Sequence, residues 1–594
     1  MKAANSIQTH QPSTSVAIAY QVAMSQPESH LFEVTLEVTG WERDFLDLKL
    51  PVWTPGSYLV REYAKHVQDF SAATVEGMPL SWHKASKNHW KIETPSTSGV
   101  VVRYRVFAAE LTVRTNHLDS THGYFNGAAL FFLIPGFDRI PIDVAIVVPQ
   151  PDWKIATTLP EIAPHRFQAP DFDTLVDSPF EIGTHAKYEF ESCGKPHEFA
   201  IWGRGNLEVQ KILADTDRII QVEESLFGGL PYDRYLFLLH LSAGGFGGLE
   251  HKDSCSLNYP RLGFRQPDKY NRFMQLVAHE FFHLWNVKRI RPKALETFDY
   301  EGENYTPSLW FCEGITSYYD TIIPYRAKIY DTKTFLKILS QDITRFLTTP
   351  GRRVQPLSES SWDAWIKLYR RDANSDNCQI SYYLKGAMVA FLLELKIRNS
   401  SQNKASLDDV MRQMWQQFGK DEVGFTPTEL QSVFESVAGE KLDDFFSRYL
   451  HATEELPFEE YLSYFGLKLK DDRAEQPPFL GLKVTTKNER AIVQFVEVNS
   501  PAQQVGIEPG DELLAIDGLR VGAEQLVDRL KDYQTGDTLA ISVFHQDELR
   551  TVSTPLAEPR PTRYKLVALE QPTPEQANNF EGWLGVSLSS MQQN

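Results

Sequence analysis

The sequence predicts a multidomain α+β protein, with an N-terminal antiparallel β domain, a mainly helical domain and a third, C-terminal unit. The first observation is the length of 594 residues, because one hydrophobic core rarely organises more than about 250–300 residues. The second is a composition of 42% apolar and 23% charged residues, which is typical of globular chains. The third is that the apolar period changes along the chain, near residue 210 and again near residue 471.

Residues 15 to about 190 are expected to form strands. Short alternating or continuous apolar stretches are separated by turn residues, as in SVAIAYQVAM, LFEVTLEVTG, GVVVRYRVFA and KYEFES. Alternation over so few residues indicates strands with one face buried. The prediction is an antiparallel β domain over residues 1–190.

Between residues 210 and 455 the apolar residues recur at helical spacing. TKTFLKILSQDITRFL and QISYYLKGAMVAFLLELKIR are two of the stretches that show it. Asp, Ser or Thr precedes several of these stretches and Gly follows some, as expected of helix caps. The strand-like YLFLLHLS at 235–242 precedes most of them, and the predicted helical domain covers residues 191–470.

Charge and cysteine content exclude several classes of protein. The 60 Lys and Arg against 78 Asp and Glu give a net charge of −18, and an acidic surface repels nucleic acid and anionic membranes. The longest basic cluster, Lys288, Arg289 and Arg291, is interpreted as a solvated turn after a helix, and contact with a peptide backbone or carboxylate is the alternative. Four cysteines without a CxxC pair predict neither a disulfide framework nor a thiolate zinc site. With a polar start and no long apolar run, we expect a cytoplasmic protein without membrane spans.

A pattern typical of metal-dependent hydrolases lies in the helical stretch VAHEFFHLWN. His279, Glu280 and His283 form HExxH, and a spacing of four places both imidazoles on one helix face, where they can bind one Zn²⁺. Glu280 is offset by one residue, where a general base for a zinc-activated water belongs. With 16 histidines in the chain, chance gives only about 0.06 such patterns, although a buried helix with paired polar residues also fits.

Glu313, in SLWFCEGITSYYD, is the predicted third zinc ligand. Catalytic zinc sites use three protein ligands and keep a further position for water. Pro292, Gly302 and Pro307 interrupt the chain after His283, so that it can loop out and return. Aromatic neighbours indicate that Glu313 is a buried carboxylate, which needs a cation. The alternative is a solvated carboxylate at a helix start.

Beyond a charged, Pro-containing joint at residues 471–478, the chain resembles a PDZ domain. The resemblance rests on FLGL at 479–482, on SPAQQVGIEPGDELLAIDG and on the helical AEQLVDRLKDY. A PDZ-type groove binds an extended peptide by strand addition, so a peptide C-terminus or internal segment is an expected partner. A purely structural cap is the alternative. The expected boundaries are 471–560 for this domain and 561–594 for a C-terminal tail without predicted structure.

The two halves of the metal pattern together resemble the gluzincin aminopeptidases. HExxHxW is followed by W-x-x-E-G-x-x-S-Y, which begins at Trp310. The segments LPVWTPGSYLVREYAKHV and SPFEIG and the PDZ-like unit resemble the M61 glycyl aminopeptidase family more closely than the M1 family. The resemblance spans residues 15 to 555 and implies a thermolysin-like catalytic domain between the β domain and the PDZ domain.

The same resemblance points to a substrate-binding loop. Gly247, Gly248 and Glu250 resemble the GAMEN motif of the M1 relatives, with Glu250 at the acidic position. A carboxylate near zinc can bind the α-ammonium of a peptide substrate by a charge-assisted hydrogen bond. His251 departs from the motif, which has Asn there, and Gly-Leu replaces Ala-Met. A flexible glycine-rich turn remains the alternative.

Two further residues are carried over from the resemblance. Tyr383, in SYYLKGA, matches the tyrosine of Tyr-x-Lys-Gly, which implies a hydrogen bond to the oxyanion, whereas Tyr382 is one residue out of register. Two tyrosines that merely pack at a helix start are the alternative. Asp320 matches an acidic position seven residues after Glu313, and its expected role is to orient a zinc ligand. A solvent-facing Asp320 is the alternative.

The resemblance therefore implies a zinc aminopeptidase with one Zn²⁺ per chain that removes small N-terminal residues such as Gly or Ala from peptides. Two alternatives remain open. One is a zinc endopeptidase that recruits substrates through the PDZ domain. The other is a non-catalytic PDZ scaffold that binds peptides and holds a structural zinc.

Overall fold

This computed structural model describes residues 16–591. The polar start, on which the expectation of no secretory signal rests, falls in residues 1–15 and lies outside the described residues. Contacts divide the chain into two compact units. The first unit takes in residues up to 220, 230–284 and 297–304, and the second takes in 221–229, 285–296 and residues from 305 onward. The predicted domain boundaries near residues 190, 470 and 560 stay predictions.

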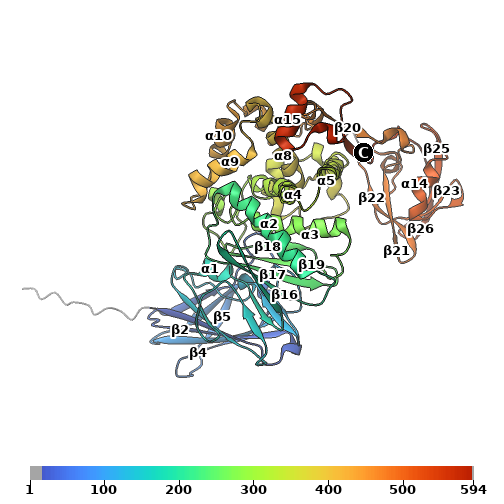
Figure 1. The fold of residues 1–594 in the computed structure, drawn as a ribbon. Coiled ribbons are helices and arrows are strands. Elements are labelled where there is room, and N and C mark those ends of the chain that lie inside the picture. Colours follow the sequence, from blue (N-terminus) through green and yellow to red (C-terminus); the bar gives the residue numbers. More distant parts are fainter. Residues whose placement is uncertain (1–15, 592–594) are drawn as a thin grey trace, which may run out of the picture. The chain divides into compact units, whose positions relative to one another are not determined.

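The N-terminal β domain is confirmed within the first unit (Figure 1, blue). Its strands form as the alternation predicts, because side chains of β2 such as Phe32 and Leu36 point into the core while their neighbours stay partly exposed. Neighbouring strands of the largest sheet are antiparallel, except for the parallel pair β1 and β10. Their order is β12 (Glu161–Ala163), β13 (Arg166–Ala169), β10 (Ile142–Val147), β1 (Ala17–Ala23), β2 (Leu31–Thr39), β7 (Gly99–Phe107) and β4 (Val67–Thr74).

Two smaller sheets and one short helix complete this β domain. Leu48 and Trp90 are paired strand residues that bury their side chains in the same core as β2. One sheet has the order β3 (Phe45–Lys49), β6 (His89–Glu93) and β5 (Trp82–Ser86). The other sheet has the order β11 (Lys154–Ala156), β14 (Phe180–Gly183), β9 (His122–Phe125) and β8 (His117–Leu118), and the helix is α1 (Phe172–Val176).

A five-stranded sheet follows in the first unit and carries part of the predicted site. The predicted strand at 235–242 is confirmed as β17, which pairs in parallel with a strand on either side. Both of its faces are buried, which explains its continuous apolar sequence. Helix α3 (Pro267–Phe282) contacts β18, which is an edge strand of this sheet, and its neighbour β19 (Figure 1). The strand order is β15 (Ala186–Ser192), β16 (Lys195–Trp202), β17 (Tyr235–Ser242), β19 (Ser254–Pro260) and β18 (Gly247–Glu250).

The second unit contains most helices of the predicted helical region, whereas α3 lies in the first unit. Helix α8 is buried on nearly every face, which agrees with its apolar sequence. A π-helical turn, η5 (Trp310–Ile315), packs against α8 so closely that Gly314 and Gly386 face each other. The described helices of this region are α4 (Thr316–Arg326), α5 (Thr332–Leu347), α6 (Leu357–Trp362), α7 (Ser375–Cys378), α8 (Tyr382–Ser401), α9 (Leu407–Met414), α10 (Pro427–Ala438), α11 (Asp443–Tyr449) and α12 (Phe458–Ser463). Helix α2 (Val209–Phe227) begins in the first unit and ends in the second.

The PDZ domain of the second unit has its own core, which includes Leu480, Val493, Ile516 and Ile541. Strand β21 lies at the end of its sheet and pairs with β22. The order is β21 (Leu482–Lys487), β22 (Arg490–Val496), β23 (Glu512–Ile516), β25 (Thr538–His545) and β26 (Glu548–Pro555), and β24 (Leu519–Arg520) pairs with β23. The helices are α13 (Pro501–Gln504) and α14 (Leu526–Leu530).

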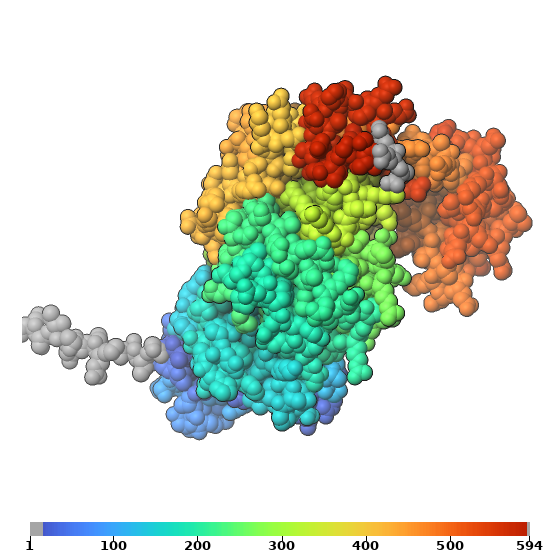
Figure 2. Space-filling model, viewed as in Figure 1, coloured from blue at the N-terminus to red at the C-terminus, as the bar shows by residue number. Residues whose placement is uncertain are grey.

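The last segment, for which the sequence predicts no structure, is ordered into a strand and a helix. Strand β27 (Tyr564–Ala568) pairs with β20 (Leu467–Asp471), on the other side of the PDZ domain in sequence. Helix α15 (Pro574–Leu584) contacts α8, and β27 contacts α5. Figure 2 shows this segment in red, lying against the yellow helices of the second unit. No helix among residues 16–591 combines the length and apolar composition needed to span a lipid bilayer.

The contact between η5 and α8 predicts a stability effect. A Cβ atom on Gly314 would lie 2.5 Å from the Cα of Gly386, so Gly314→Ala must push the two helices apart. We expect a loss of about 1–3 kcal/mol in the free energy of unfolding, seen as a lower melting temperature and faster hydrogen exchange in α8. Gly302→Ala is the control, because the nearest atom to its Cβ is 4.0 Å away. Equal melting temperatures for the two variants would contradict this packing.

Candidate active site

His279 and His283 lie at the C-terminal end of α3, with their ring centroids 4.6 Å apart and their planes nearly perpendicular. Pro267 begins this helix, at the position where its missing N–H is tolerated. Phe273 and Val277 anchor its buried face. His283 is the residue that ends the helix and still has helical dihedral angles. The predicted pairing of the two imidazoles is therefore present.

Glu280 is 4% exposed and lies against the backbone of β18. A Cβ atom on Gly248 would be 2.1 Å from its Oε1, so the strand can approach this carboxylate only because residue 248 has no side chain. One ligand atom from each of Glu250, Glu280 and His283 lies within 4.8 Å of the others. The structure thus brings the predicted base, the predicted amine anchor and one predicted zinc ligand together in the first unit.

Glu250, at the end of β18, is 4% exposed, and its Oε1 has no hydrogen-bond partner among residues 16–591. Gly56 closes one side of it, because a Cβ atom there would lie 2.5 Å from Oε1. A buried carboxylate oxygen without a donor is costly, and an incoming ammonium group would supply the missing donor. These surroundings fit the predicted role better than a flexible turn does.

Gly247 and Gly248 are held by Arg114, whose Nη2 donates to the carbonyl oxygen of Gly248 (3.1 Å). Gly247 has a φ of +141°, a conformation that side-chain-bearing residues rarely adopt. Sequence reasoning missed both Arg114 and Gly56. The only signal was that Gly56 falls inside the quoted LPVWTPGSYLV segment, and no local pattern linked Arg114 to β18.

Glu313 lies in the π-helical turn η5 of the second unit and is 1% exposed, so its predicted burial is confirmed. Single π-helical turns occur frequently at functional sites. Asn286 Nδ2 donates to the carbonyl oxygens of Phe311 (3.0 Å) and Cys312 (3.2 Å), which directly precede Glu313. Because Asn286 follows His283 by three residues, this side chain ties η5 to the chain that leaves the HExxH helix.

Tyr383 lies in the first turn of α8, where the side chain of Ser381 caps the helix by accepting from Leu384 N. Burial and the nearby charge of Glu313 hold the pKa of Tyr383 well above its usual value, so its phenol stays protonated and can donate. Its ring stacks on Tyr382, and its hydroxyl lies 3.4 Å from that of Tyr369. Asp320, on α4, accepts a hydrogen bond from Thr321 Oγ1 (3.0 Å), and its role toward a zinc ligand stays a prediction.

The donor chemistry of these residues fits a zinc ion. Zinc in catalytic sites is bound by imidazole nitrogens and carboxylate oxygens, and the paired rings on α3 supply two such donors. The buried carboxylates of Glu250, Glu280 and Glu313 also favour a cation, because ionised groups with so little exposure are costly without one.

Comparisons with known proteins agree with this chemistry. The Peptidase M61 N-terminal domain matches residues 19–184, the M61 glycyl aminopeptidase domain matches 272–389 and a PDZ domain matches 478–556. A solved structure of an aminopeptidase N family protein from Idiomarina loihiensis is 33% identical and covers 96% of this chain and 100% of its own, with a TM-score of 0.90.

A more distant solved structure is the M1 zinc metallopeptidase from Deinococcus radiodurans. It is 14% identical, covers 74% of this chain and 95% of its own, and has a TM-score of 0.46, which is too low to bear on function. No curated protein matches the chain.

These findings define a zinc metallopeptidase, and more narrowly a zinc aminopeptidase with a PDZ domain. The chain belongs to the M61 glycyl aminopeptidase family. The individual roles of the site residues stay predictions.

The contact between Gly248 and Glu280 predicts a catalytic defect. Gly248→Ala must displace the Glu280 carboxylate, because the new methyl group would occupy its position. We expect kcat to fall about 100-fold, as for other misplacements near 1 Å, while the bound metal is retained. Gly244→Ala, just before β18, is the control, since a Cβ there meets no atom within 4 Å. Equal kcat values for both variants would show that Glu280 does not act from this position.

Proposed function

We propose that the protein removes single residues from the N-termini of peptides, with zinc bound by His279, His283 and Glu313. The observation that carries the proposal is the placement of Glu250 within 4.8 Å of Glu280. The α-nitrogen and the carbonyl carbon of one residue are two bonds apart. An ammonium group bound to Glu250 therefore leaves space for one residue before the peptide bond whose hydrolysis Glu280 assists as general base.

A zinc ion in this site supplies Lewis-acid polarisation and activates water at neutral pH. Glu280 accepts the proton of the attacking water and returns it to the leaving amine. Glu250 holds the substrate's α-ammonium through a charge-assisted hydrogen bond. The neutral phenol of Tyr383 donates to the carbonyl oxygen as negative charge develops there, the type of contribution that is worth about 2.7–4 kcal/mol in other oxyanion holes.

The proposed substrates are peptides with a small first residue, Gly or Ala, as the family's description as glycyl aminopeptidases suggests. A panel of aminoacyl amides tests this preference. The highest kcat/KM is expected for Gly and Ala, and equal values for Leu or Phe would overturn it. Cleavage of N-blocked peptides at rates similar to free ones would instead favour an endopeptidase.

The PDZ domain is proposed to bind an extended segment of a peptide or protein. Strand β21 lies at the end of its sheet, which leaves an edge where a peptide strand can be added. Asn377, on α7, attaches this domain within the second unit. Its Nδ2 donates to Val496 O (2.9 Å), and its Oδ1 accepts from Val498 N (3.0 Å).

Glu280→Gln tests the general base. The amide keeps the shape of the side chain but cannot accept a proton in this way, so we expect hydrolysis of Gly and Ala amides to fall at least 100-fold. Zinc content, measured by mass spectrometry of the metal, should stay unchanged. Glu303→Gln, at an exposed position, is the matched control. Retained hydrolysis in Glu280→Gln would remove the assignment of Glu280 as the general base, whereas a wild-type chain that binds zinc without hydrolysing any of these amides would support a non-catalytic scaffold.

Glu250→Gln tests the amine anchor. The loss of a charge-assisted hydrogen bond is worth about 1.5–3 kcal/mol, which corresponds to a fall of roughly 10- to 150-fold in kcat/KM on substrates with a free amine. Zinc content should not change, because Glu250 is not a proposed ligand. An unchanged kcat/KM would remove the assignment of Glu250 while leaving the zinc site intact.

A further inference from the structure

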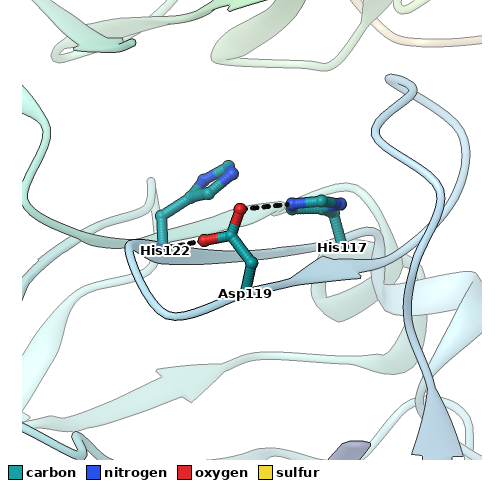
Figure 3. A group of neighbouring side chains, drawn as sticks. All are labelled: His117, Asp119 and His122. Atoms are coloured by element: carbon teal, nitrogen blue, oxygen red, sulfur yellow. Dashed lines mark hydrogen bonds and ion pairs between the residues drawn. The ribbon is translucent and has the colours of Figure 1, made fainter. Parts of the chain in front are cut away.

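A second cluster of potential metal ligands lies in the β8–β9 hairpin of the first unit, outside the peptidase site. His117 is on β8, Asp119 is in the turn and His122 begins β9, a pattern of H-x-D-x-x-H. Each residue offers one ligand atom, and these atoms lie within 4.8 Å of one another. Figure 3 shows the Asp119 carboxylate between the two imidazole rings, with His117 Nε2 at 3.2 Å from Oδ2.

His122 is oriented as a metal ligand would be. Its Nδ1 lies 3.0 Å from Oε1 of Glu181, and both side chains are fully buried. In this hydrogen bond the carboxylate oxygen of Glu181 accepts and His122 Nδ1 donates. In the neutral ring, Nε2 then carries the lone pair. That nitrogen is buried and has no hydrogen-bond partner among residues 16–591.

Glu181 serves to position His122. Its second oxygen, Oε2, accepts from His240 Nε2 at 2.9 Å, so each carboxylate oxygen already has a histidine partner. The indole ring of Trp202 stacks on the imidazole ring of His122, with ring centroids 3.7 Å apart and planes at 14°. The His122 ring is therefore fixed in one orientation. Metal-binding histidines commonly donate their second ring nitrogen to a carboxylate in this way.

Asp119 supplies the anionic ligand. Its Oδ1 accepts hydrogen bonds from Thr121 N (2.7 Å), Thr121 Oγ1 (2.6 Å) and His122 N (3.1 Å), so the turn holds the carboxylate in place. The side chains of His117 and Asp119 are 13% and 30% exposed, so an ion can reach the cluster from solvent.

We propose that His117, Asp119 and His122 form a second metal site that binds a divalent transition metal, with Zn²⁺ the best match. Two imidazoles and one carboxylate suit zinc rather than magnesium or calcium, which prefer oxygen ligands only. The ion links the β8–β9 turn to β14 through the hydrogen bond between His122 and Glu181.

Metal counting on the full-length chain tests the site. After saturation with Zn²⁺ and removal of unbound ion, we expect two zinc ions per chain, measured by mass spectrometry of the metal. His117→Ala and the more conservative His117→Gln should each retain one ion. His83→Ala, which removes an exposed histidine of β5, should retain two. One zinc per wild-type chain, or equal counts in the wild type and both His117 variants, would overturn the proposal.

A second set of variants separates this site from the peptidase centre. His283→Ala should retain one zinc ion, and the double variant with His117→Ala should retain none. Glu181→Gln should weaken Zn²⁺ binding at the second site about 10- to 100-fold, the usual cost of losing an outer carboxylate. Titration with Co²⁺, followed by its visible absorption, reports each site spectroscopically. A cobalt spectrum of His283→Ala that His117→Ala leaves unchanged would also overturn the proposal.

Discussion

The side-chain amide of Asn286 joins two segments of the chain. One segment follows the predicted zinc ligand His283, and the other carries the predicted ligand Glu313, 30 residues later. It bonds to the carbonyl oxygens of Phe311 and Cys312 and to Thr316 Oγ1, so the start and end of the π-helical turn share one buried partner. The HExxH helix ends three residues before Asn286. Any displacement of η5 along α8 therefore breaks hydrogen bonds in a place that water cannot reach, which is costly. The position of Glu313 depends on this constraint.

Much of the fold could be predicted where the signal was local. TKTFLKILSQDITRFL corresponds to α5, Thr332–Leu347, because Asp331 caps its first turn and its apolar residues share one face. No local pattern predicts that the segment carrying Glu313 forms a π-helical turn ahead of α4. That turn depends on close packing between Gly314 and Gly386, two residues far apart in sequence. The pairing of β27 with β20 could not be predicted from a local pattern either, because the whole PDZ domain separates the two strands in the sequence.

In the candidate site, too, local patterns predict some features, and others depend on packing between distant segments. The spacing of HExxH predicts the paired rings of His279 and His283, and the aromatic flanks of Glu313 predict its burial. The interpretation of Lys288 and Arg289 as a solvated turn is wrong, since they are only 8% and 4% exposed. Their burial follows from the packing of the chain after α3, which no local pattern encodes.

The close approach of Gly56 to Glu250 places a residue of the N-terminal β domain beside the proposed amine anchor. One wall of this carboxylate comes from a loop that precedes Glu250 by almost 200 residues, so its surroundings are complete only when both segments have folded. A proteolytic fragment that begins near residue 191 would keep the HExxH helix and lose this wall. Such a fragment would contain both Glu250 and Glu280 but would lack Gly56 beside the first and Arg114, which holds β18 next to the second.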